Sequence, residues 1–277
     1  MNQDKAISFP GNVSVVIPTC DRNVYLPEAI SSVQKQSVSN IEIIVVNNGQ
    51  GRLPDGLVRK TVKVLDIPPY SGAAAARNAG AIAATGDVLA FLDDDDRWAE
   101  NYLENLIDTM RTEKADCVFS TRVRFYSDGR TRPYKNPLPK KIPGPHDSQF
   151  YKAPGFGGTN FVIRRDTFLE IGGFDADLRT SEDQDLFVRL VRSGKKLATC
   201  AAAVCLVRHH LHPRLTDGAF SGTWRYYRKH RADAGVAQHW QFLLSLIHCA
   251  KKSAVRRIKR IMLARIDGKS TGAAKAY

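Results

Sequence analysis

Short runs of almost uninterrupted apolar residues alternate with helical patterns along the N-terminal third of the chain. The runs Val13–Ile17, Ile41–Val46 and Val88–Leu92 predict buried strands, and segments 24–36 and 71–86 between them carry helical spacing. Strands that are apolar on both faces need helices over both faces, which is typical of parallel sheets. We therefore expect an α/β fold with a Rossmann-like, mostly parallel central sheet flanked by helices.

The remaining pattern continues this alternation. Segment 130–154, rich in Pro, Lys and Gly, is expected to be a long loop. The further elements that we expect are strands at Val62–Leu65, Phe161–Ile163 and Leu197–Val207 and helices at Ala99–Arg111, Arg165–Ile171 and Glu182–Arg192.

Charge and composition narrow the class of protein. The 277 residues carry a net charge of +13, which favours an anionic partner such as a nucleic acid, a membrane surface or a phosphorylated substrate. No apolar run reaches the roughly 18 residues of a spanning helix, and no signal peptide is recognisable, so we expect a cytoplasmic protein. The five cysteines form no C-x-x-C pair, so we expect reduced thiols.

The acidic run Asp93–Asp96 directly follows the apolar run Val88–Leu92. Ligands of such sheets lie at the C-terminal ends of the strands, where Asn47–Gly49 ends another predicted strand. Adjacent carboxylates are favourable when a divalent cation neutralises them, and Mg²⁺ or Mn²⁺ takes one or two carboxylates plus substrate phosphates. In an extended segment Asp93 and Asp95 share one side, and the acid between them points elsewhere. The alternative is an acidic loop that binds nothing.

A second acidic cluster begins the predicted helix at Ser181, which forms a capping-box pattern with the glutamine three residues later. Glu182 and Asp183 stand one turn before apolar residues, so we expect them to point inward. Asp185 stands one turn before Arg189 and is expected to point outward and pair with it. A carboxylate at the rim of an apolar region can have a raised pKa and act as a base. The alternative is that these acids only stabilise a helix N-terminus.

The chain resembles the family 2 glycosyltransferases of the GT-A fold. The resemblance covers about residues 11–215, which we take as the catalytic domain, with 216–277 as a basic helical C-terminal extension. Six stretches carry it, in the family's order and spacing: VSVVIPTCDR, IEIIVVNNG, GAAAARNAG, TGDVLAFLDDDDRW, GGFDADL and EDQDLFVRL.

The resemblance implies an inverting hexosyltransferase that uses a nucleotide-diphosphate sugar, with Mn²⁺ or Mg²⁺ as cofactor. It implies Asp183 as the catalytic base and Asp95 as the main metal ligand. His212, in a His-Pro pair, would approach the metal or the diphosphate; His210 is the alternative, and a solvated histidine is the other possibility. The nucleotide-sugar-binding residues that it implies are Thr19, Asn47, Asn48, Arg77, Asp93, Asp94, Trp98 and Glu182.

Two of these assignments carry alternatives. Trp98 either walls the sugar pocket or belongs to the core. The family usually has Asp-Asp-Gly-Ser where this chain has Asn47-Asn48-Gly49-Gln50. A carboxylate there accepts the uracil imide hydrogen, whereas Asn accepts through its amide oxygen and also donates. A UDP-sugar stays the expected donor, with the identity of the base open.

The composition changes beyond Trp224. From Trp240 to Met262, apolar residues recur every three to four positions with Lys and Arg between them. This pattern predicts a basic amphipathic helix on an anionic membrane surface. The alternative is a helix packed on the catalytic domain. We expect no nucleic-acid partner, because no recognised module is present.

The expected activity is therefore sugar transfer to a glycan or lipid-linked acceptor in polysaccharide or glycolipid biosynthesis, with peripheral membrane association. A non-catalytic membrane-surface module with a degenerate nucleotide-sugar site is the alternative. A phosphatase of the haloacid dehalogenase type also has Asp-x-Asp after a strand, but it wants Thr or Val where Arg97 follows Asp95.

Overall fold

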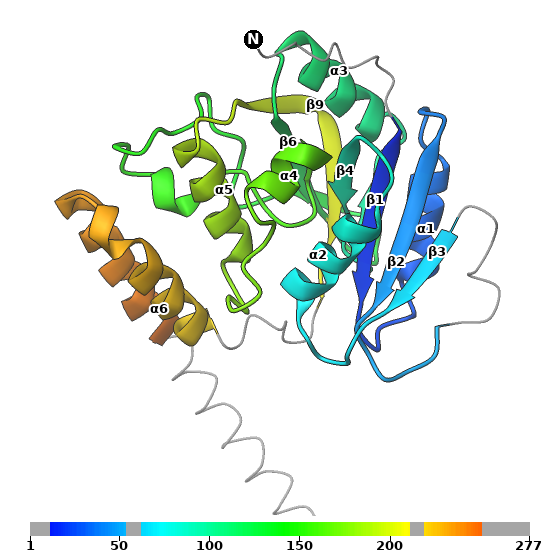
Figure 1. Ribbon diagram of the computed structural model, residues 1–277, viewed down its shortest axis with the longest axis horizontal. Helices are drawn as coiled ribbons and strands as arrows, with labels where there is room; N and C mark the ends of the chain where they lie inside the picture. The colour runs from blue at the N-terminus through cyan, green and yellow to red at the C-terminus, as the bar shows by residue number, and fades with distance from the viewer. Residues whose placement is uncertain (1–11, 54–61, 211–218, 251–277) are drawn as a thin grey trace, which may run out of the picture. The chain divides into compact units, whose positions relative to one another are not determined.

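The computed structural model describes residues 12–53, 62–210 and 219–250. They fall into two compact units, one within 1–211 and one within 212–277. The first unit is built on a nine-stranded sheet with the strand order β3-β2-β1-β4-β8-β6-β9-β5, and β7 pairs with β6 (Figure 1).

The first half of the sheet is parallel, as the apolar runs predict. Residues Thr19, Asn47 and Asp66 lie side by side in register at the C-terminal ends of three neighbouring strands. The elements of this half are β1 (Val13–Thr19), α1 (Leu26–Gln34), β2 (Ile41–Asn47), β3 (Val62–Asp66), α2 (Ala73–Ala83) and β4 (Val88–Phe91).

The second half mixes strand directions. Strand β8 runs antiparallel to both β4 and β6, whereas β9 runs parallel to β6 with a register shift after Ser120. Three of its strands, β5, β6 and β7, were not among the predicted elements. The elements are β5 (Arg97–Trp98), α3 (Tyr102–Thr112), β6 (Cys117–Phe125), β7 (Thr131–Pro133), a short 3-10 helix (Phe150–Lys152), β8 (Phe161–Arg164), α4 (Arg165–Glu170), α5 (Glu182–Arg192) and β9 (Leu197–Arg208).

Helices cover both faces of the sheet. On one face α1 and α3 share a fully buried core with alternate residues of the strands, such as Val15 and Ile17. On the other face lies an aromatic cluster, in which the Phe91 ring centroid is 5.2 Å from those of Phe161 and Phe168. The expectation of an α/β fold with helices on both faces of the sheet is confirmed, and the sheet combines a parallel first half with a second half of mixed strand directions.

Helix α2 lies very close to the sheet because it presents small residues. A Cβ on Gly80 would collide with the Val16 side chain and would come within 3.0 Å of Val46 Cγ2. Arg77 stands one turn earlier on the same buried side of α2 and is 4% exposed. The close contact therefore carries a long cationic side chain directly over the C-terminal ends of the strands.

The second unit is helical in its described part. It contains α6 (Ala219–His230) and a helix over 236–250, with a 3-10 turn (Arg231–Asp233) between them. The rings of Tyr226 and Tyr227 pack on Phe242 with centroids 5.6 and 5.0 Å away. Among the described residues, no helix combines the length and the apolar character needed to cross a bilayer. All five cysteines are free thiols, as expected.

Candidate active site

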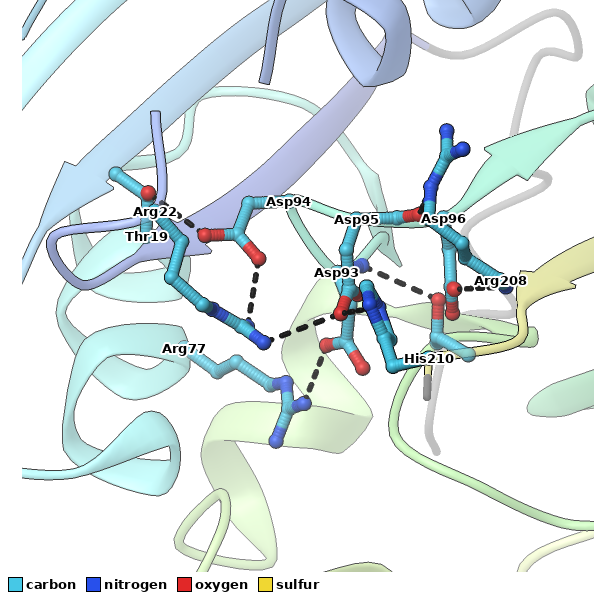
Figure 2. Close-up of polar contacts among 10 residues, drawn as sticks. Thr19, Arg22, Arg77, Asp93, Asp94, Asp95, Asp96, Arg208 and His210 are labelled. Carbon is cyan, nitrogen blue, oxygen red and sulfur yellow. Dashed lines mark hydrogen bonds and ion pairs between the residues drawn. The ribbon is translucent and has the colours of Figure 1, made fainter. Parts of the chain in front are cut away.

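The acidic run turns sharply after β4, and its side chains separate to two sides (Figure 2). Asp94 is fully buried; one of its oxygens accepts from Thr19 Oγ1 at 2.7 Å and the other from Arg22 at 2.8 Å. Burial raises the pKa of the Asp94 carboxyl to about 6, although Arg22 and Thr19 act in the opposite direction. As expected, Asp94 lies outside the group that contains Asp93 and Asp95, but the guanidinium of Arg22 bridges it to Asp95.

The other three acids of the run gather in one place. Oxygen atoms of Asp93, Asp95 and Asp96 all lie within 4.8 Å of one another. Asp96 was not among the predicted site residues, because an extended segment would have placed it beside Asp94. A turn in which Asp96 N donates to Asp93 O at 3.1 Å brings it into the group. An all-carboxylate set of this kind is suited to a hard divalent cation.

Three basic side chains and one backbone N–H, from four places in the chain, face these acids. Arg77 on α2 donates to Asp93 Oδ1 at 2.6 Å, and Arg22 in the loop after β1 donates to Asp95 Oδ2 at 3.1 Å. His210, just after β9, lies 2.8 Å from the same oxygen of Asp95. The backbone N–H of Arg208, in β9 itself, donates to Asp96 Oδ1 at 2.9 Å. His210 is thus the histidine seen at the acids, whereas His212 lies outside the described residues.

The start of α5 joins this group through Arg77. Its guanidinium also donates to Glu182 Oε1 at 3.2 Å. Burial and the neighbouring Asp183 raise the pKa of Glu182 to about 7, although Arg77 lowers it. Burial likewise raises the pKa of Asp183, against the lowering effect of Arg122. Two acids from the second cluster and the acids of the first therefore share one neighbourhood, with Arg77 between them.

Two expectations for α5 are wrong. Ser181 makes no side-chain capping bond, because its backbone is left-handed with φ 69°. Asp185 pairs with Arg189 at 2.7 Å as predicted, but it is fully buried rather than outward. The reason is that the Arg189 guanidinium also donates to the backbone oxygens of Ile171 and Gly173 at 2.7 and 2.6 Å, which draws the pair into the packing.

The end of β2 and the loop after it use their asparagine side chains in hydrogen bonds within the protein. Asn47 Nδ2 donates to Asp66 Oδ1 at 2.9 Å, and its Oδ1 accepts from Gly49 N at 3.2 Å. Asn48 Oδ1 accepts from Ser71 N at 2.8 Å. Asn47 pairs in register with Thr19, and Asn48 N donates to Thr19 O at 2.8 Å, so both asparagines lie at the C-terminal ends of the strands. Their part in binding a base stays a prediction.

Trp98 belongs to the core. It is 3% exposed, and its ring stacks on Tyr102 with centroids 4.4 Å apart. Its Nε1 donates to the backbone oxygen of Thr159 at 3.4 Å, and Thr159 Oγ1 accepts from Asp93 N at 3.1 Å. The structure therefore favours the core alternative over a wall of the sugar pocket. Thr159, Arg22 and Arg208 were not predicted as site residues, since each reaches the acidic run from a loop or strand end that is distant from it in sequence.

Comparison with known structures and families identifies the class. TarS residues 1–349 of S. aureus in complex with UDP-GlcNAc superimposes with a TM-score of 0.63 at 16% identity, covering 86% of this chain and 72% of that one. GalNAc-T7 with UDP, GalNAc and Mn²⁺ gives a TM-score of 0.60 at 19% identity, covering 79% of this chain and 48% of that one. The fold is therefore that of the GT-A glycosyltransferases. The family described as glycosyl transferase family 2 matches residues 14–172, and the chain belongs to it.

Relatives support the same assignment, and a glycosyltransferase-like family 2 description also matches residues 148–240. The uncharacterized glycosyltransferase YwdF of Bacillus subtilis strain 168 is 31% identical over 199 residues, which cover 69% of this chain and 73% of that protein. The amylovoran biosynthesis glycosyltransferase AmsB of Erwinia amylovora is 28% identical over 231 residues, covering 76% and 72%.

The two asparagines at the end of β2 and in the loop after it should respond differently to substitution. Asn47→Asp places a carboxylate against Asp66 and removes a hydrogen bond, so the free energy of unfolding should fall by about 1–3 kcal/mol. Asn48→Asp keeps the oxygen that accepts from Ser71 and places no carboxylate against Asp66, so its loss should be smaller than that of Asn47→Asp, even though Asn48 is buried. Urea denaturation at pH 7 measures the free energy of unfolding of both variants. Added salt should reduce the difference between them, because it screens the repulsion from the exposed carboxylate of Asp66. Equal losses in the two variants would contradict this assignment.

Proposed function

We propose that this chain transfers a sugar from a UDP-sugar to an acceptor hydroxyl with inversion, in polysaccharide or glycolipid biosynthesis. The observation that carries the proposal is the double contact of Arg77 with Asp93 and Glu182. It joins the acidic run at the strand ends to the start of α5, which are the two places where the family resemblance puts donor binding and the base. Neighbours with UDP-GlcNAc and with UDP and Mn²⁺, and a relative named for amylovoran biosynthesis, support the choice of substrates.

The donor set fits the expected cofactor, Mn²⁺ or Mg²⁺. Asp93, Asp95 and Asp96 offer oxygen ligands only, which both ions prefer. The ion, when bound, would act as a Lewis acid that offsets charge on the leaving diphosphate. Around it Arg22 and His210 hold Asp95 in place, and Arg77 holds Asp93.

The proposed base is Asp183. Its carboxylate would take the proton of the acceptor hydroxyl as that oxygen attacks the anomeric carbon and the bond to the diphosphate breaks. Burial raises its pKa, which makes it a stronger proton acceptor, while Arg122 limits the rise. Glu182, held by Arg77, would position the sugar beside it.

The second unit supplies the proposed membrane contact, on the cytoplasmic face. On the helix over 236–250, exposed apolar residues stand at helical spacing, with Trp240 62% and Leu244 63% exposed. The sequence that follows is rich in Lys and Arg, and its residues 251–277 lie outside the described part. An apolar stripe flanked by cations suits an interface of anionic lipid.

The metal assignment is tested with Asp95→Ala. We expect calorimetry to show that Mn²⁺-dependent UDP binding is lost, because the variant removes an oxygen ligand from the middle of the group. Asp108→Ala on α3 is the matched control, since its side chain is 58% exposed and pairs with Arg111 on the surface. Unchanged Mn²⁺-dependent binding in Asp95→Ala would remove the assignment.

The base is tested by comparing Asp183→Asn with Asp185→Asn. The first should slow transfer by roughly 10²- to 10⁴-fold, the scale of general-base catalysis, with UDP binding kept. The second should lower the free energy of unfolding by about 1–3 kcal/mol, because it weakens a buried ion pair, and should spare the rate of the folded enzyme. Sugar transfer by Asp183→Asn at the wild-type rate would refute the assignment of Asp183 as the base. No sugar transfer and no donor hydrolysis by the wild type would favour the non-catalytic membrane module instead.

Vesicle sedimentation tests the membrane contact. Each cation near an anionic surface contributes about 1 kcal/mol to binding. Replacing four Lys and Arg residues of the C-terminal segment should therefore weaken binding to anionic vesicles by up to roughly a thousandfold. Trp240→Ala with Leu244→Ala should weaken it independently. Equal binding to anionic and neutral vesicles, or none to either, would show that the unit serves the protein's own packing. The four substitutions, all to Gln, are at Lys252, Arg256, Lys259 and Arg260.

A further inference from the structure

Three arginines share one face of the hairpin formed by β6 and β7; we call them the hairpin arginines: Arg122, Arg124 and Arg132. Arg124 lies directly opposite Arg132 in the register, and Arg122 stands two residues before Arg124 on the same side of β6. The ring of Tyr134 lies 4.4 Å from the Arg122 guanidinium and 5.3 Å from that of Arg124. Stacking of this kind orients guanidinium planes and leaves their edges free to donate.

None of the hairpin arginines forms an ion pair with a carboxylate among the residues that the structure describes, although the charge of Arg122 lowers the pKa of Asp183. Like charges placed directly opposite on neighbouring strands destabilise the pair. The acids in segment 117–152 are Asp128 and Asp147, against eight Lys and Arg. Asp128 pairs with Arg130, and Asp147 accepts from Gly144 N at 2.7 Å. The hairpin therefore carries a concentrated positive charge that an anion would neutralise.

A loop with two glycines connects this charge to the active site. Arg122 donates to the backbone oxygen of Phe156 at 3.3 Å, and a Cβ on Gly157 would collide with its guanidinium. A Cβ on the next residue, Gly158, would lie 2.9 Å from the guanidinium of Arg77. The two-glycine backbone thus has one arginine against each residue.

Arg122 acts electrostatically on Asp183, the proposed base. Its charge is the largest of those that lower the pKa of Asp183, and its Nε is buried with no hydrogen-bond partner in the described chain. Arg77, at the other glycine, is already engaged by Asp93 and Glu182. The donor diphosphate is assigned to the acidic run, so the hairpin arginines are left for the other substrate.

We propose that the hairpin arginines bind an anionic group of the acceptor, a phosphate or a carboxylate close to the hydroxyl that is attacked. The proposal rests on the function proposed above. Guanidinium groups match both anions through paired N–H donors. A nucleic acid or a lipid bilayer would also meet these cations, but the contact of Arg122 with the loop beside the base favours a group on the acceptor.

The test measures binding to protein saturated with UDP and Mn²⁺, so that the donor site is filled. The probes are glucose 6-phosphate, methyl glucuronoside and neutral methyl glucoside, titrated by calorimetry. We expect at least one charged probe to bind roughly tenfold more tightly than the neutral one, the scale of one charge-assisted hydrogen bond. The two charged probes distinguish a phosphate from a carboxylate.

Arg124→Gln and Arg132→Gln should each remove this preference. Both should leave the free energy of unfolding unchanged or raised, since they relieve repulsion, which a merely structural role would not do. Arg111→Gln on α3, whose side chain is 61% exposed, is the matched control and should keep the preference. Equal binding of charged and neutral probes, no binding of a charged probe, or an equal loss in Arg111→Gln would overturn the proposal.

Two further measurements keep the proposals separate. If wild-type protein fails to bind UDP with Mn²⁺, the proposed function fails, and the comparison of probes and variants is made on the unsaturated protein. Binding of a duplex oligonucleotide or of anionic vesicles that is lost in Arg132→Gln, with no preference among the sugar probes, would assign the hairpin to another partner and overturn the acceptor role.

Discussion

The site depends on one buried guanidinium. The Arg77 side chain is 5% exposed, contacts Asp93 and Glu182, and stacks over Phe174 at 5.4 Å. A cation removed from water is costly unless carboxylates and hydrogen bonds compensate, and here the compensation comes from two distant parts of the chain. The end of β4 and the start of α5 are held together as a result. A lysine would offer a single point charge in place of two separate donor edges.

The sequence was most informative where a local pattern coincided with a buried element. Strands β1, β2 and β4 lie within one or two residues of their predicted limits, because their apolar runs are long enough to be unambiguous. Helix α5 has the predicted limits, since acids mark its start and its apolar face has a clear period. The opposite sides of Asp93 and Asp94 also followed from strand geometry, and the six family motifs identified the fold.

The features that could not be predicted depend on contacts distant in sequence. Strand β6 was missed because Arg122 and Arg124 break its apolar pattern, and only pairing with β8 and β9 places it in the sheet. Asp96 joins the acidic group through a turn that an alternation argument does not contain. Asp185 is buried because its partner Arg189 also donates to backbone oxygens in the loop after α4. Periodicity along one helix carries no information of that kind.

The two-glycine loop has an electrostatic consequence. The bare backbone of Gly157 lies against the guanidinium of Arg122, and that of Gly158 lies against the guanidinium of Arg77. The charges of both arginines lower the pKa of Asp183, and the charge of Arg77 also lowers that of Glu182, against the larger, opposite effect of burial. Any side chain at either glycine would move a guanidinium away and weaken this lowering effect. The absence of two methyl groups thus limits how far burial raises the pKa values of the acids of α5.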